Sequence, residues 1–263
     1  MTRLLFSQVT KARRYKGKRF AGRLLLLGSS GWVLWTIARS RHLLAEGRTV
    51  ARHSQSFSRD YFVGDAARRL RTYLVLGDST AAGWGARQLA ETYPYQIAEA
   101  VARRGFRVHV VNVAVGGARL HDVLNDQVRF LKTVRPQLVS LSIGANDATH
   151  FTSDADYTRD LKTLISQLRE STANDVLLAN TPDMFQAPAL PWPLAVAVGL
   201  RARRQNALWD SSLRDTSIHA VDLFHRGKLV YKRDHQLYAR DMFHPSAKGY
   251  GIWAKLFIEA MKR

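Results

Sequence analysis

The sequence predicts an α/β fold in which helices cover both faces of a parallel sheet. Short apolar runs of strand length alternate with segments of helical periodicity, and a polar cluster directly follows several of these runs. The chain has 263 residues, of which 46% are hydrophobic, enough for one substantial domain and a tail. A helical segment separates each apolar run from the next. We therefore expect a five-stranded parallel sheet.

The expected elements begin after residue 71. The five strands are predicted at Thr72–Leu76, Arg107–Val113, Gln137–Ile143, Asp175–Asn180 and Ile218–Asp222. Apolar residues at helical spacing predict the helices at Tyr95–Val101, Leu120–Leu131, Tyr157–Leu168, Leu194–Leu213 and Ser246–Met261. Thr92 and Ser246 are expected to cap the first and the last of these helices.

Residues 1–71 differ from the rest of the chain in charge. They hold 16 Lys and Arg residues against three acidic residues, and so carry most of the net charge of +19. These basic residues flank an apolar stretch instead of forming one face of the domain, which argues against nucleic acid as a partner. We divide the chain into a basic tail with a connector, residues 1–71, and a globular domain, residues 72–263.

The apolar stretch between Arg23 and Arg39 has 15 residues. As a helix it would be about 22 Å long, against ~30 Å for the hydrocarbon core of a bilayer; counting from Phe20 lengthens it but includes Arg23. We expect a membrane anchor at about residues 20–38, with a cleaved signal peptide or a helix lying on the surface as alternatives. More basic residues precede the stretch than follow it, which predicts a domain outside the cytoplasm. The alternative is a cytoplasmic protein whose tail lies on anionic lipid.

Ser79 is a candidate nucleophile in the cluster Gly77-Asp78-Ser79, directly after the first expected strand. Carboxyl ends of parallel strands are where an open α/β sheet places its ligand groups. The small residues that follow would let a helix N-terminus approach an anionic intermediate. Ala81 distinguishes the segment from the Gly-x-Ser-x-Gly nucleophile elbow. The alternative is an ordinary loop or helix-capping serine.

Two further clusters supply the other groups that acyl transfer needs. Asp241 stands three residues before His244, so it can accept the Nδ1 proton and leave Nε2 as a base; a surface turn before a helix is the alternative. Asn146 can donate a side-chain N–H to an oxyanion, or can be a turn residue in the left-handed conformation. Gly117 can bring a backbone N–H close to a ligand, or can form a tight turn.

Taken together, Gly77-Asp78-Ser79, Gly117, Gly144-x-Asn146-Asp147 and Asp241-x-x-His244 resemble the SGNH (GDSL-type) hydrolase family in order and spacing. The resemblance covers residues 72–263. It implies a flavodoxin-like three-layer α/β/α sandwich and ester hydrolysis without a metal or nucleotide cofactor. It places the catalytic serine, aspartate and histidine on Ser79, Asp241 and His244. The oxyanion hole falls on the N–H groups of Ser79 and Gly117 and the side chain of Asn146.

We therefore expect a serine esterase that hydrolyses carboxylic esters of lipids or acylated carbohydrates. One alternative is an acyltransferase or a cell-envelope polysaccharide deacetylase that uses the same site. The other is a non-catalytic protein that binds anionic surfaces or nucleic acid through its basic tail. The chain has no cysteine, and its histidines lack metal-ligand spacing, so neither a thiolate nucleophile nor a metal is expected.

Three further features could take part in binding. Trp84 and the loop Thr181–Phe185 both follow expected strands, and either could line an acyl pocket or be ordinary core and loop residues. The segment Pro191-Trp192-Pro193 could be a lid or a membrane-facing patch, but we favour the buried start of a helix. Arg201, Arg203 and Arg204 are expected on a solvated face.

Overall fold

The computed structural model describes residues 38–39, 41–42, 45–171, 173–213, 218–227 and 234–262. The chain divides into two compact units, Met1–Leu44 and Ala45–Arg263. The expected anchor at residues 20–38 lies, apart from Ala38, outside the described residues. Within the described part of the chain, no helix combines the length and the apolar character needed to span a bilayer.

The second unit is built on a six-stranded sheet in the order β1-β3-β2-β4-β5-β6. Its strands are β1 (Asp60–Val63), β2 (Arg69–Gly77), β3 (Phe106–Asn112), β4 (Leu138–Ser142), β5 (Asp175–Ala179) and β6 (His219–Val221). Strands β2 to β6 are parallel, as expected, and each overlaps its predicted range. The α/β fold class is thus confirmed.

The prediction of five strands is wrong by one. Strand β1 pairs antiparallel with β3 at the edge of the sheet, with Asp60 opposite Val111 and Val63 opposite Val108. It is short, and Val63 is its only buried residue, so it lacks the apolar run that marks the other strands. Its pairing with a strand more than 40 residues along the chain holds it in place.

The boundary expected between residues 71 and 72 is also corrected. The compact unit begins at Ala45, and residues 45–54 are helical. The Arg59 carbonyl accepts a hydrogen bond from the Asn112 amide at 2.8 Å, and the Arg59 guanidinium donates to the Ala114 carbonyl at 2.9 Å. The connector is therefore part of the domain that carries the site.

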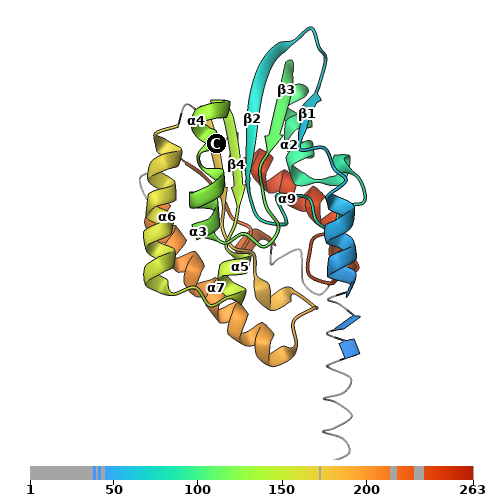
Figure 1. The fold of residues 1–263 in the computed structure, drawn as a ribbon, viewed down its shortest axis with the longest axis vertical. Coiled ribbons are helices and arrows are strands. Elements are labelled where there is room, and N and C mark those ends of the chain that lie inside the picture. The colour runs from blue at the N-terminus through green and yellow to red at the C-terminus, as the bar shows by residue number, and fades with distance from the viewer. Residues whose placement is uncertain are drawn as a thin grey trace, which may run out of the picture. The chain divides into compact units, whose positions relative to one another are not determined.

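Helices cover both faces of the sheet (Figure 1). They are α2 (Tyr93–Ala102), α3 (Leu120–Asp122), α4 (Phe130–Val134), α5 (Ala145–Thr149), α6 (Asp154–Arg169), α7 (Trp192–Leu213) and α9 (Ala247–Ala260). Alternate residues of β2 divide between two cores: Tyr73 and Val75 pack with α2 and α9, and Leu74 and Leu76 pack with α3, α4 and α6. The period of two in a strand produces this division, because successive side chains point to opposite faces.

The helix ends show which sequence signals were sufficient. Thr92 and Ser246 are N-caps whose hydroxyls accept from the amides of Tyr95 and Gly249, as expected. The helix predicted at 120–131 is instead interrupted by a wide π turn at Val123–Gln127. This turn carries Gln127, whose side-chain amide bonds both the N–H and the carbonyl of Gly77, at 2.8 and 2.9 Å.

Helix α7 begins at Trp192 and differs from the expectation of a buried start. The Trp192 side chain is 75% exposed, and Leu194 is also exposed. The buried side of the helix is formed further along by Val198, Ala202 and Trp209. An isolated apolar segment cannot reveal which side of a helix lacks a partner, so only the packing decided this point.

The order of the strands positions the site. The chain leaves β2 towards β3 on one side and leaves β4 towards β5 on the other. Adjacent strands whose connections diverge leave a crevice at their carboxyl ends, where α/β proteins bind ligands. Ser79 follows β2 and Asn146 follows β4. These two predicted site residues therefore flank the crevice.

Candidate active site

Ser79 lies in a buried loop between β2 and α2 and is 7% exposed. The loop is attached to the body of the domain by Tyr250, whose hydroxyl donates to the carbonyls of Thr80 and Trp84 at 3.1 and 2.6 Å. Asn112 adds a third bond, from its side-chain amide to the Ala81 carbonyl at 2.9 Å. The position of Ser79 is therefore set by residues of α9 and β3 as well as by its own strand.

The Asp78 side chain forms hydrogen bonds within the same loop. Its Oδ1 accepts from the Thr80 amide at 2.9 Å and from the Thr80 hydroxyl at 2.7 Å. Burial raises the pKa of Asp78 to about 6, because desolvation outweighs the two hydrogen bonds from Thr80 and the attraction of His244. The sequence showed Asp78 beside Ser79 but did not reveal this structural role.

Ser79, His244 and Asp241 form a connected row of side chains. His244 Nε2 lies 2.9 Å from Ser79 Oγ, and His244 Nδ1 lies 2.5 Å from Asp241 Oδ2. All three side chains are buried. A carboxylate bonded to Nδ1 selects the tautomer in which Nε2 is free to accept a proton. The geometry therefore allows proton transfer from the serine hydroxyl to the imidazole.

The turn 241–244 holds the carboxylate and the imidazole together locally. Asp241 Oδ1 accepts from the backbone amides of Phe243 and His244, both at 3.0 Å, while Oδ2 contacts the imidazole. Burial alone would raise the pKa of Asp241, but these bonds and the attraction of His244 outweigh it, so the pKa lies below its ordinary value. The Asp241 side chain is therefore an anion at neutral pH.

A glycine makes the close approach of the two loops possible. Gly85 has φ +97°, and a Cβ atom there would lie 2.2 Å from the Pro245 carbonyl oxygen. Any other residue would separate the loop of Ser79 from the segment of His244. Next to this contact, the centroids of the Trp84 and His244 rings are 5.3 Å apart. Trp84 thus covers the imidazole and is not among the residues that line the pocket described below.

Asn146 and Gly117 come from two loops that are bonded to each other. The Asn146 side chain donates to the Ala118 carbonyl at 3.0 Å. Asp147, which the sequence analysis did not single out, accepts from the Leu120 amide at 3.0 Å and from the Thr152 hydroxyl at 3.0 Å. The α5 helix therefore holds the loop after β3 in register. Burial raises the pKa of Asp147 despite these bonds.

Two of the three candidate oxyanion donors, Gly117 and Asn146, differ in their relation to the pocket described below, because Asn146 lines it and Gly117 does not. Gly117 has φ +85°, and a Cβ atom there would meet nothing within 4 Å. Asn146 is the second residue of α5 and not a left-handed turn residue. An amide nitrogen has two hydrogens, and the bond to Ala118 uses one of them. Within the described part of the chain, no bond to the second hydrogen is found.

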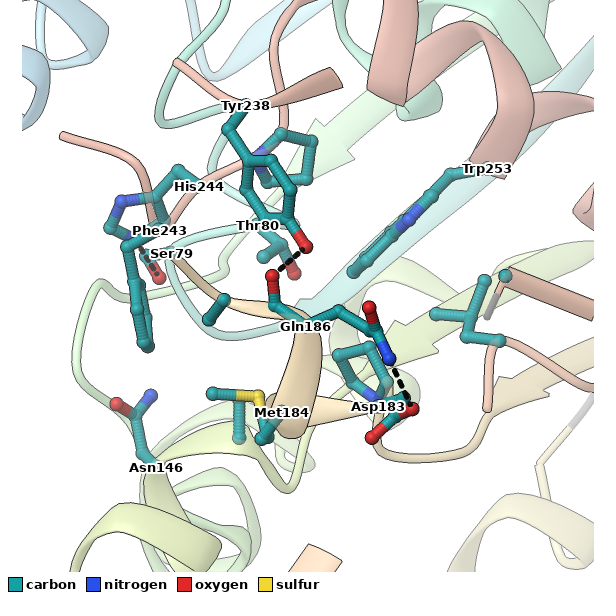
Figure 2. Close-up of a pocket in the computed structure, with 16 residues that line it drawn as sticks. Ser79, Thr80, Asn146, Asp183, Met184, Gln186, Tyr238, Phe243, His244 and Trp253 are labelled. Atoms are coloured by element: carbon teal, nitrogen blue, oxygen red, sulfur yellow. Dashed lines mark hydrogen bonds between the residues drawn. The ribbon is translucent and has the colours of Figure 1, made fainter. Parts of the chain in front are cut away.

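A mostly apolar pocket opens beside Ser79, with a cavity of about 60 Å³. Figure 2 shows Ser79 and His244 at one side of it and Asn146 facing them from α5. Its apolar wall is formed by Pro182, Met184, Ala187, Leu223, Tyr238, Phe243 and Trp253. Of the loop Thr181–Phe185 expected to line an acyl pocket, Pro182 to Met184 do so, but Thr181 and Phe185 do not. Tyr238 steadies this wall by donating to the Gln186 carbonyl at 2.8 Å.

The comparison with known families agrees with this geometry. The model of the GDSL-like lipase/acylhydrolase family matches residues 75–252. The chain belongs to this family. The resemblance found in the sequence is thereby confirmed, and the matched range includes the three loops that carry Ser79, Asn146 and His244.

Individual members of the GDSL-like family are similar to different extents. A GDSL-like esterase of Mycobacterium tuberculosis (strain ATCC 25618 / H37Rv) is 27% identical over 192 residues, which are 72% of this chain and 61% of that protein. An arylesterase of Vibrio mimicus is 29% identical over 113 residues, which are 43% of this chain and 56% of that protein. In each case the matched region spans about three fifths of the relative's length.

A solved structure extends the comparison to the fold. The crystal structure of TesA superposes with a TM-score of 0.60 at 19% sequence identity, covering 73% of this chain and 98% of that chain. At this identity the likeness concerns the fold, which is the α/β architecture described above.

Proposed function

We propose that the chain is a serine ester hydrolase in which Ser79 is the nucleophile, His244 the general base and Asp241 the orienting carboxylate. The observation that carries the proposal is the 2.9 Å separation of Ser79 Oγ and His244 Nε2, with Asp241 bonded to the far side of the same ring. Membership of the GDSL-like lipase/acylhydrolase family supports the same chemistry.

The proposed reaction has two stages. Ser79 Oγ attacks the ester carbonyl while its proton passes to His244 Nε2, and Asp241 stabilises the resulting imidazolium. The backbone N–H groups of Ser79 and Gly117 and the free amide hydrogen of Asn146 bind the oxyanion. His244 then donates the proton to the leaving alcohol. In the second stage a water gives its proton to His244 and attacks the acyl-enzyme; His244 then returns the proton to Ser79 Oγ as the acyl–Oγ bond breaks, which releases the acid and restores both residues.

The pocket supports a short acyl group as the substrate. A single water needs about 10–15 Å³ of such space, so a cavity of about 60 Å³ has room for roughly four to six groups of that size. Its apolar wall suits hydrocarbon better than a sugar ring. We expect hydrolysis to be fastest for acyl chains of a few carbons and to fall for longer ones, which a series of p-nitrophenyl esters of increasing length measures.

Replacement of Ser79 tests the nucleophile. In the full chain, Ser79→Ala should abolish both ester hydrolysis and covalent labelling by a fluorophosphonate probe, since the atom that forms the acyl-enzyme is gone. Ser166→Ala is the matched control, because Ser166 is an exposed serine on α6, where it bonds Glu170. Labelling that persists in Ser79→Ala would place the nucleophile elsewhere, whereas equal loss in Ser166→Ala would show that the assay reports damage to the fold.

We also propose that the N-terminal segment anchors the enzyme in a membrane with the catalytic unit outside the cytoplasm. The proposal is supported by the apolar run between Arg23 and Arg39 and by the larger number of basic residues before it. An anchor should survive washing of membranes with high salt and carbonate, and external protease should cut the catalytic unit of intact cells. Release by either wash would instead indicate electrostatic attachment to the surface.

A further inference from the structure

Exposed apolar side chains are distributed unevenly over the catalytic unit. Eight large hydrophobic side chains are exposed among the described residues: Phe62, Leu70, Val115, Phe151, Phe185, Trp192, Leu194 and Leu200. Phe62 and Leu70 lie on β1 and at the amino end of β2, and the Phe62 ring is covered by His109 and Arg107. The other six lie in segments that follow the carboxyl ends of strands, where the site is.

Three of the six form one patch around the first half of α7, which we define as Phe185, Trp192 and Leu200. Trp192 and Leu200 are 75% and 61% exposed. They are eight residues apart with Val196 between them, so all three lie along one side of the helix. In Figure 1 this half of α7 forms the lower edge of the catalytic unit, below α5. Large apolar side chains that gather in this way mark an interaction surface.

The patch shares a wall with the acyl pocket. Phe185 belongs to the short helix η3 (Met184–Gln186), and it packs against α7 so closely that a Cβ atom on Gly199 would lie 2.6 Å from its ring. Its neighbour Met184 lines the pocket, as Figure 2 shows. One side of η3 therefore faces the ester site and the other belongs to the patch.

The positive charge beside the patch favours an anionic partner. Arg201 and Arg204 are both bonded to Asp154. Arg203 is exposed and forms no ion pair within the described part of the chain. It stands one turn beyond Gly199, on the side of the helix that carries Trp192 and Val196. An uncompensated cation next to exposed Trp and Leu favours the surface of an anionic bilayer, because such a surface attracts the cation while the apolar side chains enter the lipid.

We propose that the patch docks the catalytic unit on the surface of an anionic lipid bilayer, so that esters held in the bilayer reach Ser79 past η3. The docking of the patch on lipid is inferred from the exposed residues alone. The statement about the substrate rests on the proposed esterase function. The inference narrows the substrate class to esters presented at a lipid surface, as opposed to acylated carbohydrates in solution.

The absence of cysteine allows a direct test in the full chain. Leu200→Cys, labelled with an environment-sensitive NBD fluorophore, reports on the patch. Leu70→Cys is the matched control, because Leu70 is 50% exposed but lies about 20 Å along β2 from the site end of the strand. Both are mixed with vesicles of phosphatidylcholine and phosphatidylglycerol, and sedimentation confirms that each is bound.

The two probes separate docking of the patch from attachment through the tail. We expect the emission at position 200 to shift to the blue and to increase severalfold on vesicles, while the emission at position 70 stays unchanged. Equal responses at both positions, or none at position 200, would overturn the proposal. So would a blue-shifted probe at position 200 without lipid in a chain that sediments as a dimer, because a second copy would then cover the patch.

A second measurement links docking to catalysis. The double variant Trp192→Ser, Leu200→Ser should hydrolyse a dissolved p-nitrophenyl ester as fast as the parent, since neither residue lines the pocket. Hydrolysis of an ester with the same short acyl group on a long-chain alcohol, embedded in vesicles, should fall by about tenfold or more, because large apolar side chains no longer enter the lipid. Leu70→Ser should change neither rate. Equal rates on vesicles for parent and double variant would refute the docking role, whereas a parent inactive on every ester would refute the esterase function and leave the probe result standing.

Discussion

The two halves of the proposed active site are assembled in different ways. Ser79, His244 and Asp241 contact one another through their side chains, at 2.9 and 2.5 Å. The segments of Gly117 and Asn146 are instead joined by bonds between side chain and backbone, because Asn146 donates to the Ala118 carbonyl and Asp147 accepts from the Leu120 amide. The connected side chains offer a route for the proton of Ser79, whereas oxyanion donors need only point at the place where charge will develop.

This difference predicts unequal sensitivity to substitution. Removing a member of the proton path breaks a chain of transfers, so nearly all the catalysis it provides is lost. Removing one oxyanion donor leaves the others in place. The four substitutions that follow test this contrast, from the largest expected effect to the smallest.

His244→Ala should have the largest effect. Without the base, Ser79 is a neutral hydroxyl, and kcat should fall on the order of 10⁶-fold, as in the subtilisin series, where removing the serine or histidine alone has that effect. Steady-state hydrolysis of a dissolved p-nitrophenyl ester measures the loss. His225→Ala, which changes an exposed histidine beside Asp222, should retain activity. A loss below about 10²-fold in His244→Ala would show that another group accepts the proton.

Asp241→Asn should cost less than His244→Ala. The new amide oxygen can still accept from the amides of Phe243 and His244, so the turn is preserved. Its NH₂ group would face Nδ1 and favour the wrong tautomer, and kcat should fall by about 10⁴-fold, by analogy with the chymotrypsin-type triad. Activity equal to the parent would mean that the turn alone orients the ring.

Asn146→Ala should lower kcat by roughly 10²–10³-fold with little change in KM, the usual loss for one oxyanion donor. Asn125→Ala is the control, because Asn125 is an exposed asparagine in the π turn Val123–Gln127, where its side chain contacts His121. Near-normal kcat in Asn146→Ala would assign Asn146 only to holding Ala118. A rise in KM at constant kcat would assign it to binding the ground state.

Asp78→Asn should have the smallest effect, and it acts on stability. Folded Asp78 keeps its proton up to about pH 6, while the unfolded side chain loses it near its ordinary pKa of 3.8. Between these values the folded state binds more protons, so the free energy of unfolding of the parent falls as pH rises and is constant above. The upper limit of this loss is about 3 kcal/mol.

Asparagine at position 78 does not titrate and can still accept from the Thr80 amide and hydroxyl. Urea unfolding of the parent and of Asp78→Asn should therefore diverge from about pH 4 to about pH 6, with the variant gaining stability relative to the parent, and run parallel above. Curves that are parallel over the whole range would show that the pKa of Asp78 is the same in the folded and unfolded states. Hydrolysis by the variant would show whether the charge below Ser79 matters to the proton path.

Sequence patterns were reliable where structure is local. The five parallel strands and the caps at Thr92 and Ser246 follow from apolar periodicity and from side chains that bond an amide three residues ahead. The bond of Asp241 to His244 is also local, because it joins residues three apart in one turn. These features depend on near neighbours, so a single sequence contains the information for them.

Other features depend on partners that the sequence does not reveal. Strand β1 exists through its pairing with β3, and the π turn at Val123–Gln127 carries the side chain that bonds Gly77. The exposure of Trp192 is of the same kind, because an apolar residue at a helix start is buried only if another segment packs on it. Each was mispredicted for this reason.

The sequence by itself determined the family, the fold class and the identity of the candidate residues, since all three depend on short motifs at the ends of apolar runs. Only the tertiary structure decided that Ser79 and His244, 165 residues apart, lie within hydrogen-bond distance. It also decided that Asn146 bonds Ala118 and lines the pocket, and that exposed apolar side chains lie next to the pocket wall. The physical reason is that distance, burial and exposure are set by chain crossings and by packing between remote segments, and neither has a local signature.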